Sequence, residues 1–209
     1  MTSTTPTIHL HKNDLPDGLE FPGAVAVDSE AMGLNPVRDR LCVVQLSAGD
    51  GICHVVQIAL GQDQAPNLKR LMEDPATVKI FHYARFDVMA LKHALGIRTN
   101  PVFCTKIASK LVRTYTDRHG YKEVCRELAG AVISKEQQSS DWGQETLSRD
   151  QLVYAATDVL YLHAVREKLI TMLAREGRTE LAQNCFDFLH TRTDLDLLGW
   201  LDCDIFAHK

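Results

Sequence analysis

AVAVDSEAMGL, residues 24–34, joins a short apolar run to two acidic residues. The run is too short for a helix, and a glycine within the stretch and the Asn-Pro pair after it are turn signals, so we expect a buried strand over residues 24–30. Asp28 and Glu30 stand two residues apart, which places both side chains on one face of a strand. Because neighbouring carboxylates repel unless a cation lies between them, the stretch predicts either half of a metal site or a solvated strand end.

A third acid follows another short apolar run. Residues 78–82 are expected to form a strand, and HYARFD, residues 82–87, leads from it into a helical pattern. Asp87 therefore falls in the first turns of a helix. That position suits a metal ligand, and it also suits an acid that only stabilises the helix dipole.

A fourth acid lies on the longest helical pattern of the chain, over residues 148–176. Ser148 and Gln151 fit a capping box at its start. Tyr154 and Asp158 are four residues apart and therefore share one face of the helix. The alternative for Tyr154 is an ordinary half-buried aromatic residue.

Taken in order, these motifs resemble the RNase D branch of the DEDD 3′-to-5′ exonucleases, which have the ribonuclease H-like fold. The resemblance covers roughly residues 20–170, with DSEAMGL, HYARFD and YAATD as its three motifs. Two further stretches, RLCVVQL at residues 40–46 and SKEQQSSDW at residues 134–142, resemble RNase D in particular. The chain is similar to the tyrosine-type members, because these place tyrosine four residues before the final Asp, where Tyr154 stands. One departure is Tyr83, which replaces the usual asparagine of the second motif.

The resemblance implies hydrolysis of single-stranded RNA from its 3′ end to nucleoside 5′-monophosphates, in RNA processing that includes tRNA precursors. Two divalent ions, Mg²⁺ or Mn²⁺, would serve this reaction, since hard cations prefer carboxylate oxygens and an in-line displacement suits two metals. Asp28 would bridge them, Glu30 and Asp158 would hold the ion that activates water, and Asp87 would lie in the outer coordination of the other ion. Tyr154 would orient the attacking water. The implied contacts to the terminal nucleotide are Ala31, Met32, Gly33, Leu34 and His82.

Charge gives a weaker indication of a nucleic-acid partner. The formal net charge of −4 is not that of a typical nucleic-acid binder. Seven Lys and Arg residues nevertheless lie between residues 98 and 126, against two acids. Within this stretch Lys106, Lys110 and Arg113 are candidates for contacts to backbone phosphates, and the alternative is a solvated basic helix face.

The pattern predicts an α/β fold, with a mixed β-sheet flanked by helices. The ribonuclease H-like topology comes from the resemblance alone. We expect a single exonuclease domain over residues 1–209, with a core at about 20–176 and a helical C-terminal tail at about 177–209. We expect the chain to lack the C-terminal helical domains of longer RNase D proteins, and the sequence leaves open whether the tail caps the sheet or forms a homodimer. Strands are expected near residues 24–30, 41–47, 52–58, 78–82 and 102–103, and helices near 66–73, 84–95, 105–113, 120–129, 148–176 and 178–190.

Composition points to an ordinary globular chain. Its 209 residues are 45% hydrophobic, without an apolar run of membrane-spanning length or a recognisable secretory signal, so we expect a cytoplasmic protein with no membrane partner. The six cysteines form no Cys-x-x-Cys pair, which favours reduced and mostly buried thiols. Two rival functions remain: a DNA exonuclease of the same fold and a catalytically weak RNA-binding module.

Overall fold

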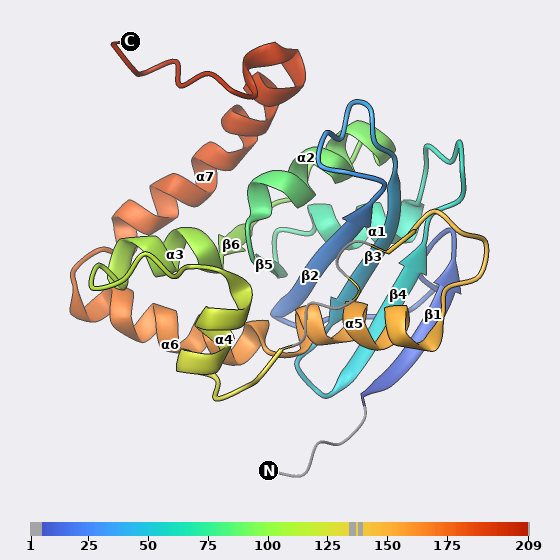
Figure 1. Cartoon of the computed structure of the whole chain (residues 1–209), viewed down its shortest axis with the longest axis horizontal. Helices are drawn as coiled ribbons and strands as arrows, with labels where there is room; N and C mark the ends of the chain where they lie inside the picture. The colour runs from blue at the N-terminus through green and yellow to red at the C-terminus, as the bar shows by residue number, and fades with distance from the viewer. Residues whose placement is uncertain (1–5, 134–136, 138–139, 209) are drawn as a thin grey trace.

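A six-stranded mixed sheet is the framework of the protein, with its strands in the order β1–β4–β3–β2–β5–β6 (Figure 1). The computed structural model describes residues 6–133, 137 and 140–208. Strands β2, β3 and β4 form an antiparallel meander; β5 and β6 continue the sheet parallel to β2, and β1 runs parallel to β4. The strands are β1 Thr7–Lys12, β2 Ala24–Ala31, β3 Leu41–Ser47, β4 Ile52–Gln57, β5 Val78–Phe81 and β6 Val102–Cys104.

Helices flank this sheet, as predicted. Helix α5 packs across β2, β3 and β4, while α2 packs against β2, β3, β5 and β6, and α7 packs against α2, α3 and β6. Figure 1 shows α7 rising from α6 and leading to the C-terminal segment. The helices are α1 Pro66–Glu73, α2 Ala84–Leu95, α3 Thr105–Val112, α4 Tyr121–Leu128, α5 Arg149–Leu160, α6 Leu162–Arg175, α7 Thr179–Leu195 and a π-helical turn η1 at Asp196–Trp200.

The structure differs from the predicted secondary structure in three places. Strand β1 was not predicted, and it extends the folded core to the N-terminal side of residue 20. The helix expected over residues 148–176 is two helices, α5 and α6, which meet at Tyr161. Neither glycine nor proline marks this break, and the apolar periodicity continues through it, so the sequence carries no local signal. The expected tail helix also continues beyond residue 190, to Leu195.

The core lies on both faces of the sheet. Every residue of β3 is buried, which agrees with its position in the middle of the strand order. All six cysteines are free thiols, and four of them are buried, as expected from their spacing. Among the described residues, no helix is long and apolar enough to cross a membrane.

Candidate active site

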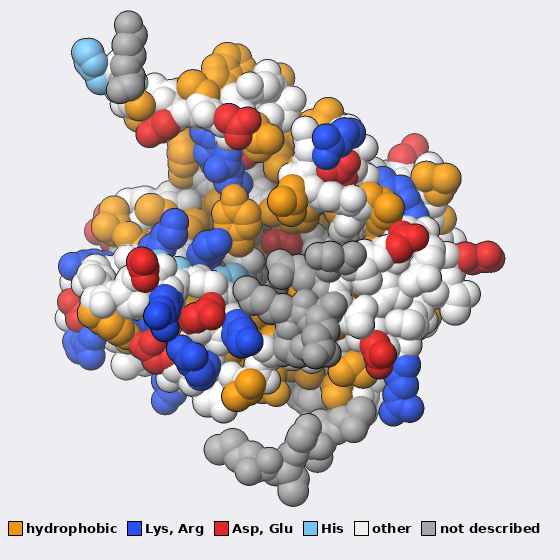
Figure 2. Space-filling model, in the orientation of Figure 1, with side chains coloured by type: hydrophobic (Ala, Val, Ile, Leu, Met, Phe, Trp, Pro, Cys, Tyr) orange, Lys and Arg blue, Asp and Glu red, His pale blue; other side chains and the backbone are white. Residues whose placement is uncertain are grey.

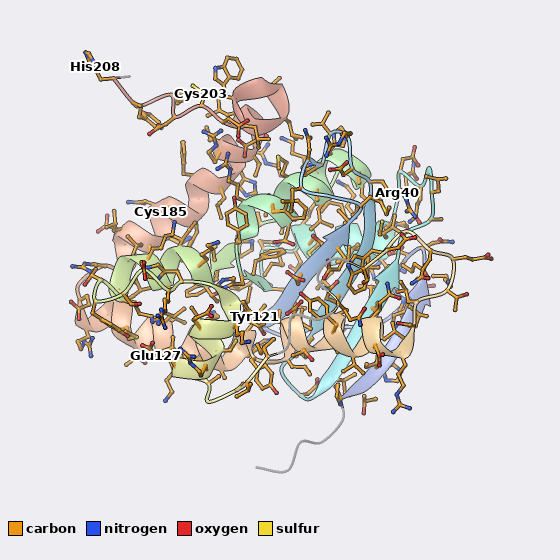
Figure 3. The ribbon with its side chains drawn as sticks, viewed as in Figure 1. Arg40, Tyr121, Glu127, Cys185, Cys203 and His208 are labelled. Atoms are coloured by element: carbon orange, nitrogen blue, oxygen red, sulfur yellow. The ribbon has the colours of Figure 1, made fainter. Side chains whose placement is uncertain are left out.

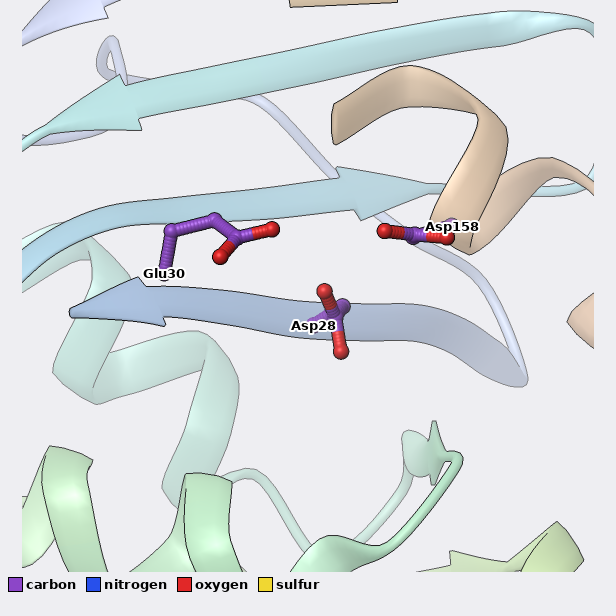
Figure 4. Close-up of side chains that lie close together, drawn as sticks. All are labelled: Asp28, Glu30 and Asp158. Atoms are coloured by element: carbon purple, nitrogen blue, oxygen red, sulfur yellow. The ribbon is translucent and has the colours of Figure 1, made fainter. Parts of the chain in front are cut away.

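Three carboxylates meet above the end of β2. Asp28 and Glu30 lie on one face of this strand, and Asp158 approaches them from α5 (Figure 4). One carboxylate oxygen of each acid lies within 4.8 Å of the corresponding oxygens of the other two. A single cation between them would contact all three, and the donor set consists of the carboxylate oxygens that Mg²⁺ and Mn²⁺ prefer.

The electrostatics of the cluster favour a bound cation. Burial raises the pKa of Asp28 well above its usual range, and the charges of Asp87, Asp158 and Glu30 raise it further. Burial, followed by Asp158 and Asp87, raises the pKa of Glu30 to about 9. These shifts mean that the clustered carboxylates resist ionisation in the metal-free protein. A divalent cation would remove this resistance by compensating their charge.

A glutamine that the sequence analysis missed supports Asp28. Gln45 lies directly opposite Asp28 in the β2–β3 register, and its Nε2 donates a hydrogen bond of 2.7 Å to Asp28 Oδ2. The Gln45 side chain is completely buried. A polar residue in the otherwise apolar run CVVQL was the available signal, since a buried amide requires a partner.

Asp87 lies beside the cluster rather than within it. It stands in the first turn of α2 and is 2% exposed, and the Ser29 hydroxyl donates a 2.6 Å hydrogen bond to its Oδ1. Burial raises the pKa of Asp87 to about 7, although the Ser29 hydrogen bond acts in the opposite direction. Asp87 therefore lies near enough to Asp28 for its charge to raise the pKa of Asp28. One of its two carboxylate oxygens already accepts the hydrogen bond from Ser29.

Tyr154 shares the α5 face of Asp158, as its spacing predicted, and lines the same cavity as the three acids. Burial raises the pKa of its phenol, and the charge of Asp158 adds to this effect, so the hydroxyl keeps its proton. Its ring packs at a tilt against Trp142, with 6.0 Å between the centroids. Trp142 is buried, which agrees with a packing role; residues 134–136 and 138–139 of the same RNase D-like stretch lie outside the described residues.

The acids form the floor of a cavity of about 680 Å³, whose rim carries the loop after β2. Figure 2 shows this site as a hollow in which acidic side chains lie. Leu34 on the rim is 85% exposed, and Met32 is 50% exposed. A Cβ at Gly33 would lie 2.3 Å from Asp39 Oδ2, so a larger residue here would require the Asp39 side chain to move. Ala31, the last residue of β2, lines the cavity together with Met32, Gly33 and Leu34, where the sequence placed the terminal nucleotide.

The other predicted substrate contacts divide into two groups. His82 and Lys106 line the cavity. His82 is neutral, because burial lowers its pKa to about 3, and its Nδ1 lies 2.9 Å from the Thr105 hydroxyl. Lys110 lines a neighbouring cavity instead.

The structure does not support the phosphate contact expected of Arg113. Its side chain is 1% exposed and forms an ion pair of 2.5 Å with Glu127. Its guanidinium also donates to the Ser109 hydroxyl and to the Arg118 carbonyl. Arg113 therefore ties α3 to α4, and its charge is compensated inside the protein. Position within a basic run could not reveal this partner, because Glu127 lies in the next helix.

Comparison with known proteins identifies the class of this site. Residues 11–174 match the 3′-5′ exonuclease family, and the chain belongs to this family. Among curated proteins it is 37% identical to the ribonuclease D of Gluconacetobacter diazotrophicus over 156 residues, which are 75% of this chain. The match covers 39% of that relative, so this chain spans about two fifths of its length.

Some solved structures resemble this chain in both sequence and fold, and others resemble it in fold alone. Brucella melitensis NrnC with bound Mg²⁺ is 57% identical, with a TM-score of 0.93 over 97% of this chain and 100% of that one. Brucella melitensis NrnC bound to pGG is likewise 57% identical, with a TM-score of 0.94 over 98% of this chain and 100% of that one. Escherichia coli RNase D, at 24% identity and a TM-score of 0.74 over 82% of this chain and 45% of its own, shares the fold. The predicted resemblance and fold class are therefore confirmed.

Proposed function

We propose that this protein hydrolyses single-stranded RNA from its 3′ end and releases nucleoside 5′-monophosphates, with two divalent ions as cofactors. The observation that carries the proposal is the convergence of Asp28, Glu30 and Asp158, with ligand oxygens within 4.8 Å of one another, at the floor of a cavity. The Mg²⁺-bound NrnC structure supports the choice of metal, since that protein shares 57% of its residues with this chain. RNA binding without hydrolysis would not require three convergent carboxylates near the phosphate.

In this scheme each residue of the site has a separate role. Two divalent ions, when bound, would supply an activated water and charge compensation for the leaving oxygen. Asp28 would bridge them, with Glu30 and Asp158 on the water side and Asp87 in the outer coordination. Tyr154 keeps its proton, and we assign its hydroxyl, which is hydrogen-bonded to Asp158, to orienting the attacking water.

We propose that the loop on the cavity rim binds the 3′-terminal nucleotide of the substrate. Leu34 and Met32 offer exposed apolar surface directly beside the acids, which suits the base of an unstacked terminal nucleotide. The NrnC structure with pGG supports a short guanine-containing oligonucleotide as a ligand of this site as well. The ribonuclease D relatives support RNA, and we include cytoplasmic tRNA precursors among the proposed substrates.

The test compares RNA and DNA oligomers of one sequence, each incubated with Mg²⁺, with Mn²⁺ and with a chelator. We expect hydrolysis of RNA with either metal, none with chelator, and slower hydrolysis of DNA. Faster hydrolysis of DNA would replace this proposal by the rival DNA exonuclease. Binding of RNA without any hydrolysis would favour the RNA-binding module.

A further inference from the structure

Three histidines lie together on the two outermost strands at one edge of the sheet. His9 and His11 are two residues apart on β1, and His54 of β4 stands directly opposite His9 in the β1–β4 register. Side chains at alternate positions of a strand, and at paired positions of neighbouring strands, lie on one face of a sheet. These three residues, which we call the edge histidines, therefore share a face beside the free edge of β1 (Figure 1).

The edge histidines lie on the face of the sheet opposite the catalytic acids. Asp28 and its hydrogen-bond partner Gln45 share one face, and Gln45 is paired with Val55 of β4. Because successive residues of a strand point to opposite faces, His54 points away from that face. Strands β4 and β3 also separate β1 from β2. The edge histidines are therefore a second group of metal-binding side chains, outside the candidate active site.

The ring nitrogens of His11 and His54 are close enough to share an ion. His11 Nε2 lies 3.0 Å from His54 Nδ1, and the ring planes are 11° apart. Two nitrogens that bind one tetrahedral Zn²⁺ stand about 3.3 Å apart, from the usual Zn–N distance of about 2 Å. A small rotation and separation of the two rings would therefore let Zn²⁺ replace the proton that they share.

His9 can supply a third nitrogen. Its ring centroid is 5.3 Å from that of His54, with 24° between the planes. His9 is exposed and makes no hydrogen bond to a described residue, so its ring can turn toward the same ion. Phe21 packs edge-on against His54, with 5.7 Å between the centroids, and holds that imidazole in place. Three imidazoles form a donor set that Zn²⁺ accepts, with a water as the fourth ligand.

His11 and His54 are neutral near pH 7, as metal binding requires. Burial lowers the pKa of His54, and His11 and His9 lower it further, whereas Asp50 acts in the opposite direction. Burial, followed by the charge of His9, lowers the pKa of His11. A neutral imidazole offers its lone pair to Zn²⁺, Co²⁺ or Ni²⁺, while Mg²⁺ prefers oxygen ligands.

We propose that His9, His11 and His54 form a binding site for a transition-metal dication of the Zn²⁺ class, which ties β1 to β4. β1 is paired on one side only, and the ion would join it to a residue 43 positions away from His11 in the sequence. Because the unfolded chain has no preformed site, binding of the ion would stabilise the folded edge strand. This inference is independent of the proposed exonuclease function.

The binding test titrates Zn²⁺ into the full-length chain by calorimetry, in excess Mg²⁺ and with Asp28→Asn, so that the active-site carboxylates do not compete. We expect one Zn²⁺ per chain in this parent protein. His9→Asn, His11→Asn and His54→Asn should each weaken binding by at least about tenfold, since even loss of a group that only orients a metal ligand costs that much. Absence of Zn²⁺ binding by the parent, or unchanged affinity in any of the three variants, would overturn the site.

Two controls keep this result decisive. His208→Asn removes an exposed histidine at the end of the C-terminal segment, far from β1 in the shared view of Figures 1 and 3, and should bind Zn²⁺ as the parent does. Circular dichroism without metal checks that each variant is folded. His9→Asn tests the site even where the other two variants fail to fold, because His9 is exposed and has no hydrogen bond to lose.

The location test uses hydrogen–deuterium exchange and Co²⁺ absorption. Zn²⁺ should slow exchange of the β1 amides in the parent and leave them unchanged in His9→Asn. Co²⁺ should give a spectrum of nitrogen ligands, whereas a thiolate charge-transfer band would assign the ion to a cysteine such as the exposed Cys203 and overturn the proposal. None of these measurements involves turnover, so an inactive enzyme that binds Zn²⁺ in this way would refute the proposed function and leave the histidine site standing.

Discussion

Gln45 Nε2 donates to Asp28 Oδ2 across the β2–β3 pair at 2.7 Å. This bond helps to fix the carboxylate that we propose as a ligand of both metals, and one oxygen of that carboxylate lies within 4.8 Å of oxygens of Glu30 and Asp158. Because the Gln45 side chain is completely buried, water cannot replace its hydrogen bond. Gln45 is therefore a positioning residue that acts through Asp28.

Gln45→Leu is expected to weaken Mn²⁺ binding about tenfold, which is the lower end for loss of a group that orients a metal ligand. Electron paramagnetic resonance of free Mn²⁺ measures this affinity without any turnover. Gln183→Leu, on the exposed face of α7, is the control for removing an amide. Unchanged Mn²⁺ affinity together with a lower melting temperature would show that Gln45 is only a structural residue.

Asp28→Asn, Glu30→Gln and Asp158→Asn are each expected to lower kcat by about 10³-fold or more, because each removes a proposed metal ligand. In chelator each variant should melt at the same or a higher temperature than the wild type, since one of the repelling charges is gone. Mg²⁺ should raise the melting temperature of the wild type more than that of any variant. Asp150→Asn, an exposed acid at the start of α5, is the control. A variant with near wild-type turnover would remove its residue from the metal site.

The pH dependence of the metal-free protein follows from Glu30, whose pKa burial raises from 4.5 to about 9. Between these values the folded state keeps a proton that the unfolded state releases, so the free energy of unfolding falls as pH rises. Glu30→Gln lacks this proton. In chelator, the melting temperature of the variant minus that of the wild type should therefore grow from pH 5 to pH 9. A constant difference would mean that Glu30 ionises normally in the folded protein.

Tyr154→Phe separates orientation of water from metal binding. If the hydroxyl orients the attacking water, the variant should lower the single-turnover rate substantially, yet less than Asp158→Asn, and it should keep its Mn²⁺ affinity. Tyr154→Ala should be worse, because it also leaves a cavity against Trp142. Wild-type chemistry in the Phe variant would make Tyr154 a packing residue, and lost metal binding would make it a structural support.

The sequence predicted most of the elements and the acidic residues of the site, for identifiable reasons. Short apolar runs and turn residues located β2 and β5, and the Ser148 capping box located the start of α5. Strand β1 escaped prediction because it is an edge strand with mostly exposed residues. Its only signal is residue-by-residue pairing with β4, which is a tertiary contact.

The supporting contacts of the site could not be predicted in the same way. Gln45 became visible only once the register placed it opposite Asp28. Arg113 looked like a free cation until the fold brought Glu127 to its guanidinium. Tyr83 was recognised as a departure from the family pattern, but its left-handed backbone, with φ of 76°, is a property of the folded chain. Motifs thus predict candidate site residues, whereas the partners that other elements supply become visible only in the structure.

The most direct test of the account uses RNA labelled at its 5′ end, with either a 3′-hydroxyl or a 3′-phosphate, incubated with the wild type and Mg²⁺. We predict a ladder of labelled fragments that shorten from the 3′ end, with release of unlabelled nucleoside 5′-monophosphates. The 3′-phosphate RNA should resist digestion, and Asp28→Asn should give no products. Release of the label first as a mononucleotide, or equal cutting of a circular RNA of the same sequence, would contradict it.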